Sequence, residues 1–190
     1  MNTALKYSLF TITLVALTTA CKFFFGPEIA LSGFSPVIAI ALFSGYFFNK
    51  KESLFTLPLL SLLLSDLFIH GLYQQGVFEY PGIYGGQWKN YLLLLSATLV
   101  GVLVRGSSYR SLSLGAIAGP TMFFILSNLM VWSASSEAVY AKTFGGLMTC
   151  YTAGLPFYRN SLVGTFVFLP LIIALFNYLE TRKASLVLAR

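Results

Sequence analysis

The feature that most constrains the fold is a series of apolar runs near the length of a membrane-spanning helix. A helix needs about 20 apolar residues to cross the hydrocarbon core of a bilayer. The runs show no period-two alternation, so they predict helices rather than barrel strands. The predicted spans are residues 4–25, 35–49, 53–73, 90–105, 111–132 and 161–180. The sequence therefore predicts an all-α membrane protein: a single transmembrane domain over residues 1–190, built as a bundle of six transmembrane helices with two long outer loops.

The composition is typical of a membrane-embedded protein. Only 9% of its residues are charged and 57% are hydrophobic, whereas soluble domains carry about 25% charged residues. The net charge of +6 does not indicate a nucleic-acid partner, because the basic residues are scattered over short loops between apolar segments. The predicted partner of most of the surface is the lipid bilayer.

Lysine and arginine positions predict the orientation of the bundle, because cytoplasmic loops are enriched in them. If the N-terminus is cytoplasmic, eight basic residues fall on the inner side and four on the outer side. The inner residues are Lys6, Lys50, Lys51, Arg105, Arg110, Arg182, Lys183 and Arg190, and the outer ones are Lys22, Lys89, Lys142 and Arg159. We therefore expect a multi-pass protein of the bacterial inner membrane with both termini in the cytoplasm.

The N-terminal segment has an alternative interpretation as a lipoprotein signal. Lys6 precedes an apolar run, residues 7–20, which ends at Cys21. Thr18 stands where such a signal would have a leucine, and the later spans make a cleaved signal unnecessary. We interpret residues 4–25 as the first transmembrane helix.

The two predicted outer loops, 74–89 and 133–160, are long and mix glycine, aromatic and polar residues. Long loops in a compact chain are usually functional or disordered. Their aromatic content argues against disorder. We expect both loops to fold over the outer mouth of the bundle.

A carboxylate and the only histidine of the chain interrupt one apolar run. Asp66 and His70 are four residues apart, so they share one face of the predicted helix. Ionisable groups inside a span are costly and normally face the bundle interior or a cavity. We expect them to border a ligand cavity. The alternatives are a carboxylate that caps a helix or pairs with a loop amide, and a structural histidine.

Other residues complete the predicted substrate-binding set. Asn128 and Trp132 share a helical face, and Arg159 and Asn160 could hold an anionic group. Their alternatives are helix–helix hydrogen bonds, the interfacial aromatic belt and a surface anchor. The predicted set is Asp66, His70, Tyr84, Trp88, Asn128, Trp132, Tyr151, Arg159 and Asn160.

Enzyme activity is not expected from the residues. The chain has no phosphate-binding loop and no nucleophile–base constellation. Its two cysteines, Cys21 and Cys150, make no disulfide framework and are interpreted as small buried thiols. No metal site is predicted, because two candidate ligands do not make one.

Four segments carry a resemblance to a known family: FSPVIAIALFSGYFF, LPLLSLLLSDLF, SNLMVW and KTFGGLMTCYTAGLPFYRNSLVG. Over residues 34–170 they resemble a bacterial family of six-span integral membrane proteins defined as a domain of unknown function. That family is similar in layout to the S components of energy-coupling factor transporters, which bind vitamins beneath outer loops. Ala16 and Ala20 resemble the A-x-x-x-A contact motif of S components, but in the outer half of the span, where an inner position is expected.

The likeness to S components implies a substrate-binding protein for micronutrient uptake. Its partners would be a vitamin-sized ligand, an energy-coupling membrane subunit and ATPases. Cobalamin is the first candidate cargo, with His70 or Cys150 as the axial ligand to its cobalt; thiamine, biotin and queuosine precursors would also suit an aromatic pocket. No resident cofactor is expected. The alternatives are a non-transport membrane assembly or interaction protein, and an intramembrane lipid-modifying enzyme with Asp66 and His70 as an acid–base pair.

Overall fold

The computed structural model describes residues 3–28, 30–49, 51–106 and 108–181, and these residues form six α-helices without a β-strand. The helices are α1 (Thr3–Phe25), α2 (Val37–Phe47), α3 (Lys51–Gln74), α4 (Trp88–Leu103), α5 (Tyr109–Ala134) and α6 (Phe144–Thr181). The predicted all-α fold is confirmed. Cys21 lies inside α1 and is buried, as expected for a helix that is part of the bundle.

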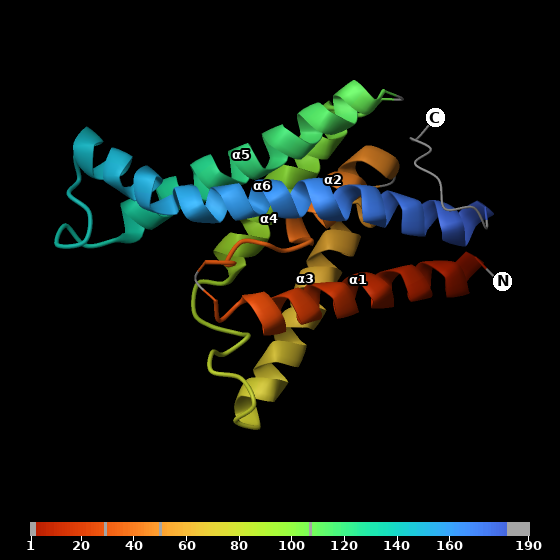
Figure 1. The fold of residues 1–190 in the computed structure, drawn as a ribbon, viewed down its shortest axis with the longest axis horizontal. Helices are drawn as coiled ribbons and strands as arrows, with labels where there is room; N and C mark the ends of the chain where they lie inside the picture. The colour runs from red at the N-terminus through yellow and green to blue at the C-terminus, as the bar shows by residue number, and fades with distance from the viewer. Residues whose placement is uncertain (1–2, 29, 50, 107, 182–190) are drawn as a thin grey trace.

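Helices α1 and α6 run along the long axis of the molecule, and α3 crosses this direction at a steep angle (Figure 1). Lys6 Nζ donates to the backbone oxygen of Glu180 at 3.1 Å and lies 3.9 Å from its carboxylate. The start of α1 and the end of α6 therefore lie together, at what we call the Lys6 end. Helices α5 and α6 form a hairpin that reaches furthest from this end (Figure 1).

Helix α2 forms the centre of the bundle. Its residues from Ile38 to Tyr46 are all buried, and α3, α4, α5 and α6 surround it. A Cβ on Gly45 would lie 2.9 Å from the Cα of Gly101, so the backbones of α2 and α4 meet where both residues are glycine. With 11 residues, α2 is about 16 Å long and covers only about half of a hydrocarbon core.

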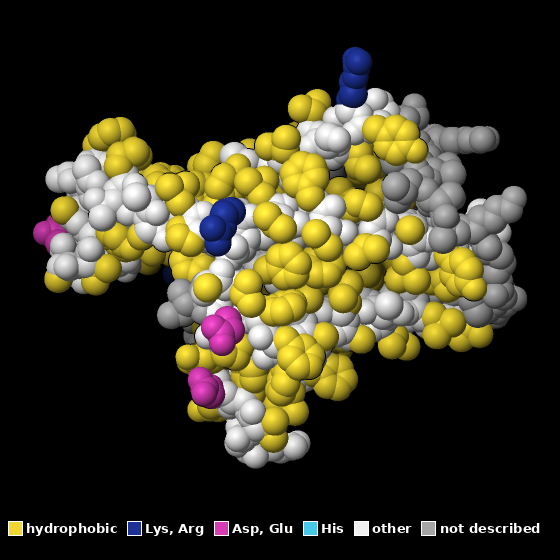
Figure 2. Space-filling view, viewed as in Figure 1, with side chains coloured by type: hydrophobic (Ala, Val, Ile, Leu, Met, Phe, Trp, Pro, Cys, Tyr) yellow, Lys and Arg dark blue, Asp and Glu magenta, His cyan; other side chains and the backbone are white. Residues whose placement is uncertain are grey.

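Within the part of the chain that the structure describes, four helices are long and apolar enough to cross a membrane: Ala4–Phe25, Leu54–Gln74, Tyr109–Ala134 and Phe144–Thr181. Helices α2 and α4 are shorter apolar helices. The finer prediction of six spans is therefore not confirmed. Hydrophobic side chains cover most of the face in Figure 2, with isolated charges, as expected for a membrane-embedded bundle. Of the basic residues behind the predicted orientation, Lys50, Arg182, Lys183 and Arg190 lie outside the described residues.

The prediction of a second long loop over residues 133–160 is wrong. Helix α6 begins at Phe144, so only residues 135–143 connect it to α5, whereas the first loop is confirmed over residues 75–87. The mixture of glycine, aromatic and polar residues predicted a loop, but helices in membranes tolerate glycine and proline. A Cβ on Gly154 would lie 2.5 Å from Asn128 Oδ1, so the side chain of Asn128 would have to shift, and glycine lets α6 approach α5 closely here.

The connection between α1 and α2 is fixed to α6 by polar contacts. The buried side chain of Asn160 donates to the backbone oxygens of Ala30 at 2.7 Å and Ser32 at 2.9 Å. Ser161 Oγ donates to the oxygen of Gly33 at 3.3 Å. Irregular backbone inside a membrane protein needs such internal partners, because lipid offers none.

Candidate functional site: the Lys22–Asp66 cavity

Asp66 is the centre of a buried polar cluster that joins three parts of the chain. Its Oδ1 accepts a hydrogen bond from the ammonium of Lys22, in the last turn of α1. Its Oδ2 accepts from Gln87 Nε2 at 2.5 Å and from Tyr91 Oη at 2.8 Å. A buried carboxylate is stable only with such compensation, so the cluster explains why an apolar helix can carry Asp66.

Lys22 is the more exposed partner of this ion pair. Its Nζ also donates to Ser65 Oγ at 2.7 Å, and Ser65 in turn donates to the backbone oxygen of Leu62. The side chains of Lys22 and Asp66 are 23% and 9% exposed. The long aliphatic stem of lysine lets it rest on apolar surface while its charge reaches a polar region. The ammonium therefore lies toward the open side of the cluster.

Gln87 fixes the 75–87 loop on α3. Besides Asp66, its Nε2 donates to the backbone oxygen of Gly82 at 2.9 Å, and its Oε1 accepts from the backbone N–H of Tyr84 at 3.2 Å. Gly82 lies directly on the backbone of Asp66 and His70, with no room for a Cβ. A glycine is required at this point because the loop and the helix meet backbone to backbone.

The 75–87 loop and the ends of α1, α3 and α4 surround a half-open cavity of about 410 Å³. Small-molecule sites are usually about 300–1,000 Å³ and combine apolar walls with a few polar groups. This cavity has both. Its lining residues are Lys22, Asp66, Gln87 and Asn90, with Gly26, Leu62, Ile69, Phe78, Tyr80, Pro81, Gly82 and Tyr84.

Tyr84 is a protonated hydroxyl at the edge of the cavity. Partial burial raises its pKa, and the negative charge of Asp66 raises it further, whereas the hydrogen bond from Asn90 lowers it in part. Asn90 Nδ2 donates to Tyr84 Oη at 2.6 Å. The net effect is a raised pKa, so the Tyr84 hydroxyl keeps its proton at neutral pH and can donate it to a ligand.

Of the predicted site residues, only Asp66 and Tyr84 line this cavity. His70 lies one turn beyond Asp66, and its Nε2 is 3.3 Å from Gln74 Nε2. Asp66 and His70 have separate hydrogen-bond partners, and the structure shows no hydrogen bond between the two side chains. Trp88 is exposed and faces a different groove, between α3 and α4.

Three predicted residues belong to the α5–α6 hairpin and stabilise it. Asn128 Nδ2 donates to the oxygen of Phe124 at 2.9 Å, and Trp132 Nε1 donates to the oxygen of Ala141 at 3.0 Å. Tyr151 Oη donates to the oxygen of Ile125 at 3.0 Å. Trp132 contacts the turn between the helices and Tyr151 connects α6 to α5, whereas the hydrogen bond of Asn128 to Phe124 stays within α5.

Arg159 and Asn160 also lie apart from the cavity. Arg159 is exposed on α6, and Asn160 is buried against the α1–α2 connection. The predicted set thus divides into a pair at the cavity, a group in the α5–α6 hairpin, a structural asparagine, and three residues apart from the cavity: His70, Trp88 and Arg159. Of the hairpin group, the sequence placed only Tyr151 in the predicted outer loop 133–160, whereas Asn128 and Trp132 were placed on the predicted span 111–132.

Neither candidate cobalt ligand lines the cavity. His70 faces Gln74, and Cys150 is buried with its Sγ 3.5 Å from the backbone oxygen of Asn128. Within the described ranges, no group of three or more His, Cys, Asp or Glu side chains could hold a metal ion. The cavity offers polar side chains for a ligand and no arrangement of soft donors for a metal.

Sequence reasoning missed Lys22, Gln87 and Tyr91 as members of the site. Lys22 had a usable signal, because it lies inside a predicted span and its charge is opposite to that of Asp66. Opposite charges inside spans usually pair. Gln87 and Tyr91 had no such signal, since glutamine is common in loops and tyrosine is common near the start of a membrane helix.

The comparisons with known proteins give one match. A family model described as a family of unknown function (DUF6580) matches residues 2–187, almost the whole chain. No curated protein and no solved structure matches the chain.

Proposed function

We propose a function for this chain, which belongs to the family of unknown function (DUF6580), from the geometry of its cavity. It is a membrane-embedded subunit that binds a small, vitamin-sized molecule for uptake. The observation that carries the proposal is the half-open cavity of about 410 Å³ with the Lys22–Asp66 pair at its floor and aromatic side chains around it. This combination is typical of small-molecule sites.

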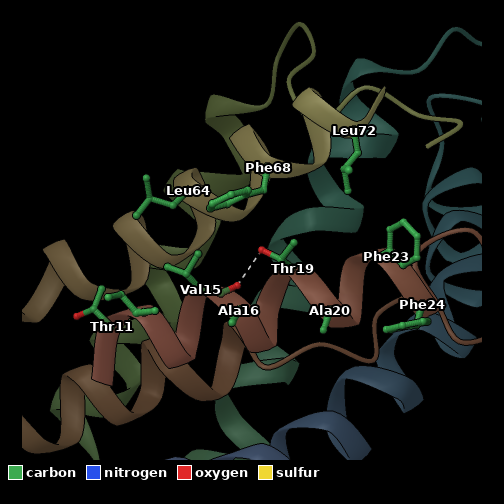
Figure 3. A pocket seen from close by; sticks show the side chains of 11 residues that line it. Thr11, Val15, Ala16, Thr19, Ala20, Phe23, Phe24, Leu64, Phe68 and Leu72 are labelled. Carbon is green, nitrogen blue, oxygen red and sulfur yellow. Dashed lines mark hydrogen bonds between the residues drawn. The ribbon is translucent and has the colours of Figure 1, made fainter. Parts of the chain in front are cut away.

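The likeness in layout to S components supports an uptake role with partners. These would be an energy-coupling membrane subunit and ATPases. An apolar groove of about 550 Å³ lies between α1 and α3 (Figure 3). Ala16 and Ala20 lie on the α1 side of this groove, and small residues let a neighbouring helix approach closely. The groove therefore supports contact with a second membrane protein.

The size of the cavity favours a compact cargo. A volume of about 410 Å³ suits a molecule such as thiamine or biotin better than the much larger cobalamin. Placement in a bacterial inner membrane with both termini in the cytoplasm remains part of the proposal. The contact between Lys6 and Glu180 supports termini on one side. The cavity, near the other end of α1, would then open to the outside.

A second candidate function is membrane assembly or interaction without transport. It is favoured by the extended α5–α6 hairpin, which exposes large apolar side chains on both helices, among them Val131, Phe144 and Leu155. Such a surface suits lipid or a partner protein. This role would need no saturable small ligand, which is how the two proposals differ in experiment.

The first experiment is to purify the protein from membranes and identify co-purifying small molecules by mass spectrometry. The matched variants are Tyr84→Ala, in the cavity wall, and Trp132→Ala, in the α5–α6 hairpin. A small molecule that is retained by the wild type and Trp132→Ala and lost from Tyr84→Ala supports the proposal. An empty wild-type protein whose melting temperature does not change with thiamine, biotin, cobalamin or queuosine precursors would favour the assembly role.

A further inference from the structure

The cavity offers a ligand two free hydrogen-bond donors, beside the amide oxygen of Asn90, which can accept. The ammonium of Lys22 uses two N–H groups for Ser65 and Asp66, and the described residues give its third N–H no partner. The hydroxyl of Tyr84 accepts from Asn90 and still has its own proton to donate. Both oxygens of Asp66 already accept hydrogen bonds from side chains of the protein. A ligand that satisfies this cavity must bring acceptors.

The charges around the cavity disfavour an anion as the source of those acceptors. The charge of Lys22 is compensated by Asp66, so the floor has little net charge. Three further charged residues are close to lining residues in the sequence. Glu79 lies between Phe78 and Tyr80, Glu28 follows Gly26 by two positions, and Lys89 lies between Gln87 and Asn90. With two carboxylates and one ammonium, this group carries a net negative charge, which acts over about 8 Å at physiological salt and disfavours an approaching anion.

The walls of the cavity favour a flat ligand. The rings of Phe78 and Tyr80 form an edge-to-face pair with centroids 6.4 Å apart, and Phe78 also contacts Phe23 at 5.8 Å. Pro81 and Tyr84 add further flat surfaces to the lining. Aromatic side chains bind planar rings through offset or edge-to-face contacts, which orient a ring as well as bury it.

We propose that the cavity binds an uncharged, planar heteroaromatic compound whose ring carbonyl accepts hydrogen bonds from Lys22 and Tyr84. The proposal rests on the proposed binding function and names its ligand class. The carbonyl takes the free N–H of Lys22, the ring lies among Phe78, Tyr80 and Tyr84, and the Lys22–Asp66 pair stays intact. A carboxylate of similar shape is disfavoured by the net negative charge of Glu28, Glu79 and Lys89 together and by the compensated charge of Lys22.

The test compares three tricyclic probes on the full-length protein in lipid nanodiscs. Lumichrome is planar and uncharged and carries ring carbonyls; phenazine is planar and lacks them; 2-anthracenecarboxylate is planar and anionic. We expect lumichrome to bind about tenfold more tightly than either of the others, as expected for a hydrogen bond to a charged donor. Fluorescence or calorimetric titration gives the three dissociation constants.

Two variants locate the effect in the cavity. Tyr84→Phe removes one donor and is expected to weaken lumichrome binding severalfold with little change for phenazine. Tyr73→Phe, on the exposed side of α3 outside the cavity, is the matched control and is expected to change neither. The paired variant Lys22→Met/Asp66→Asn removes both charges together and is expected to reduce lumichrome to the affinity of phenazine while the protein stays folded.

The outcomes separate this proposal from the proposed function. Equal affinities for lumichrome and phenazine, or tighter binding of the carboxylate, would overturn the ligand class while leaving a small-molecule site. A co-purified ligand that is anionic or not planar would overturn it in the same way. If the wild type binds no probe and co-purifies with no small molecule, the binding function itself fails.

Discussion

Lys22 and Asp66 are 44 positions apart in the sequence and form a buried ion pair between the last turn of α1 and the middle of α3. The pair has two consequences at once. It connects two helices whose facing surfaces are otherwise mostly apolar, and it forms the floor of the cavity. Experiments on this pair must therefore separate stability from binding.

Removal of only one partner of the pair should destabilise the protein strongly. Asp66→Leu leaves the ammonium of Lys22 half-buried without its counter-charge, which costs about 3–5 kcal/mol in comparable buried pairs. The melting temperature in detergent should fall markedly. In Lys22→Met/Asp66→Leu part of this loss should be recovered, because no charge remains to be compensated, whereas Gln87 and Tyr91 still lack their acceptor. If the decrease in melting temperature of the double variant equals the sum of the decreases of the two single variants, the two residues act independently.

Gly82 should be essential for the fold of the 75–87 loop. In Gly82→Ala, the new methyl group would overlap the backbone of Asp66 and His70, so the loop has to lift from α3. We expect faster proteolysis within the loop and loss of small-molecule binding. Gly85→Ala is the matched control, because a Cβ at Gly85 meets no atom within 4 Å. Equal protease sensitivity of the two variants would contradict the backbone contact.

Asn160 should act as a structural residue and Arg159 should not. Asn160→Leu removes the two hydrogen bonds from the side chain to the backbone oxygens of Ala30 and Ser32, and each such bond contributes about 1 kcal/mol. Arg159→Ala removes an exposed charge next to it and should change thermal stability by less than about 0.5 kcal/mol. Thermal unfolding of the two variants side by side checks this difference. A larger loss in Arg159→Ala would support the alternative interpretation of that arginine as a surface anchor.

The raised pKa of Tyr84 gives a pH prediction. Partial burial and, after it, the negative charge of Asp66 disfavour the phenolate, so the pKa of Tyr84 should lie above the usual tyrosine value of about 10. The ultraviolet difference titration between wild type and Tyr84→Phe isolates this residue. Asp66→Asn removes the negative charge. In that background, the ionisation of Tyr84 measured by the same difference titration should occur at lower pH. A titration that is identical in the two backgrounds would show that Asp66 does not act on Tyr84.

The folded state holds the Tyr84 proton more tightly than the unfolded chain does. The stability that this residue contributes is therefore complete below about pH 10 and falls as the pH rises toward its raised pKa. Denaturation of wild type and Tyr84→Phe at pH 8 and above pH 10 measures this dependence. The wild type should lose more stability over that interval than the variant.

The sequence predicted the helices well where apolar runs were continuous and bounded by charge. It failed at the start of α6, because Gly145, Gly146 and Pro156 are breakers in water but are tolerated in a helix that packs on another in lipid. Asp66 was recognised because a carboxylate in an apolar run needs a partner. Its actual partners come from α1, the 75–87 loop and α4, and such contacts between distant segments are not visible in local patterns.

The short central helix has a consequence for how the protein is made. Helix α2 is about 16 Å long, too short to be stable in a bilayer as an independent segment. The helices that cover it include α4, α5 and α6, which are synthesised later. The ribosome therefore releases α2 before the helices that cover it have been synthesised. The final placement of α2 in the bundle has to follow translation of most of the chain. Biogenesis of this protein cannot proceed as a simple series of helices inserted one after another.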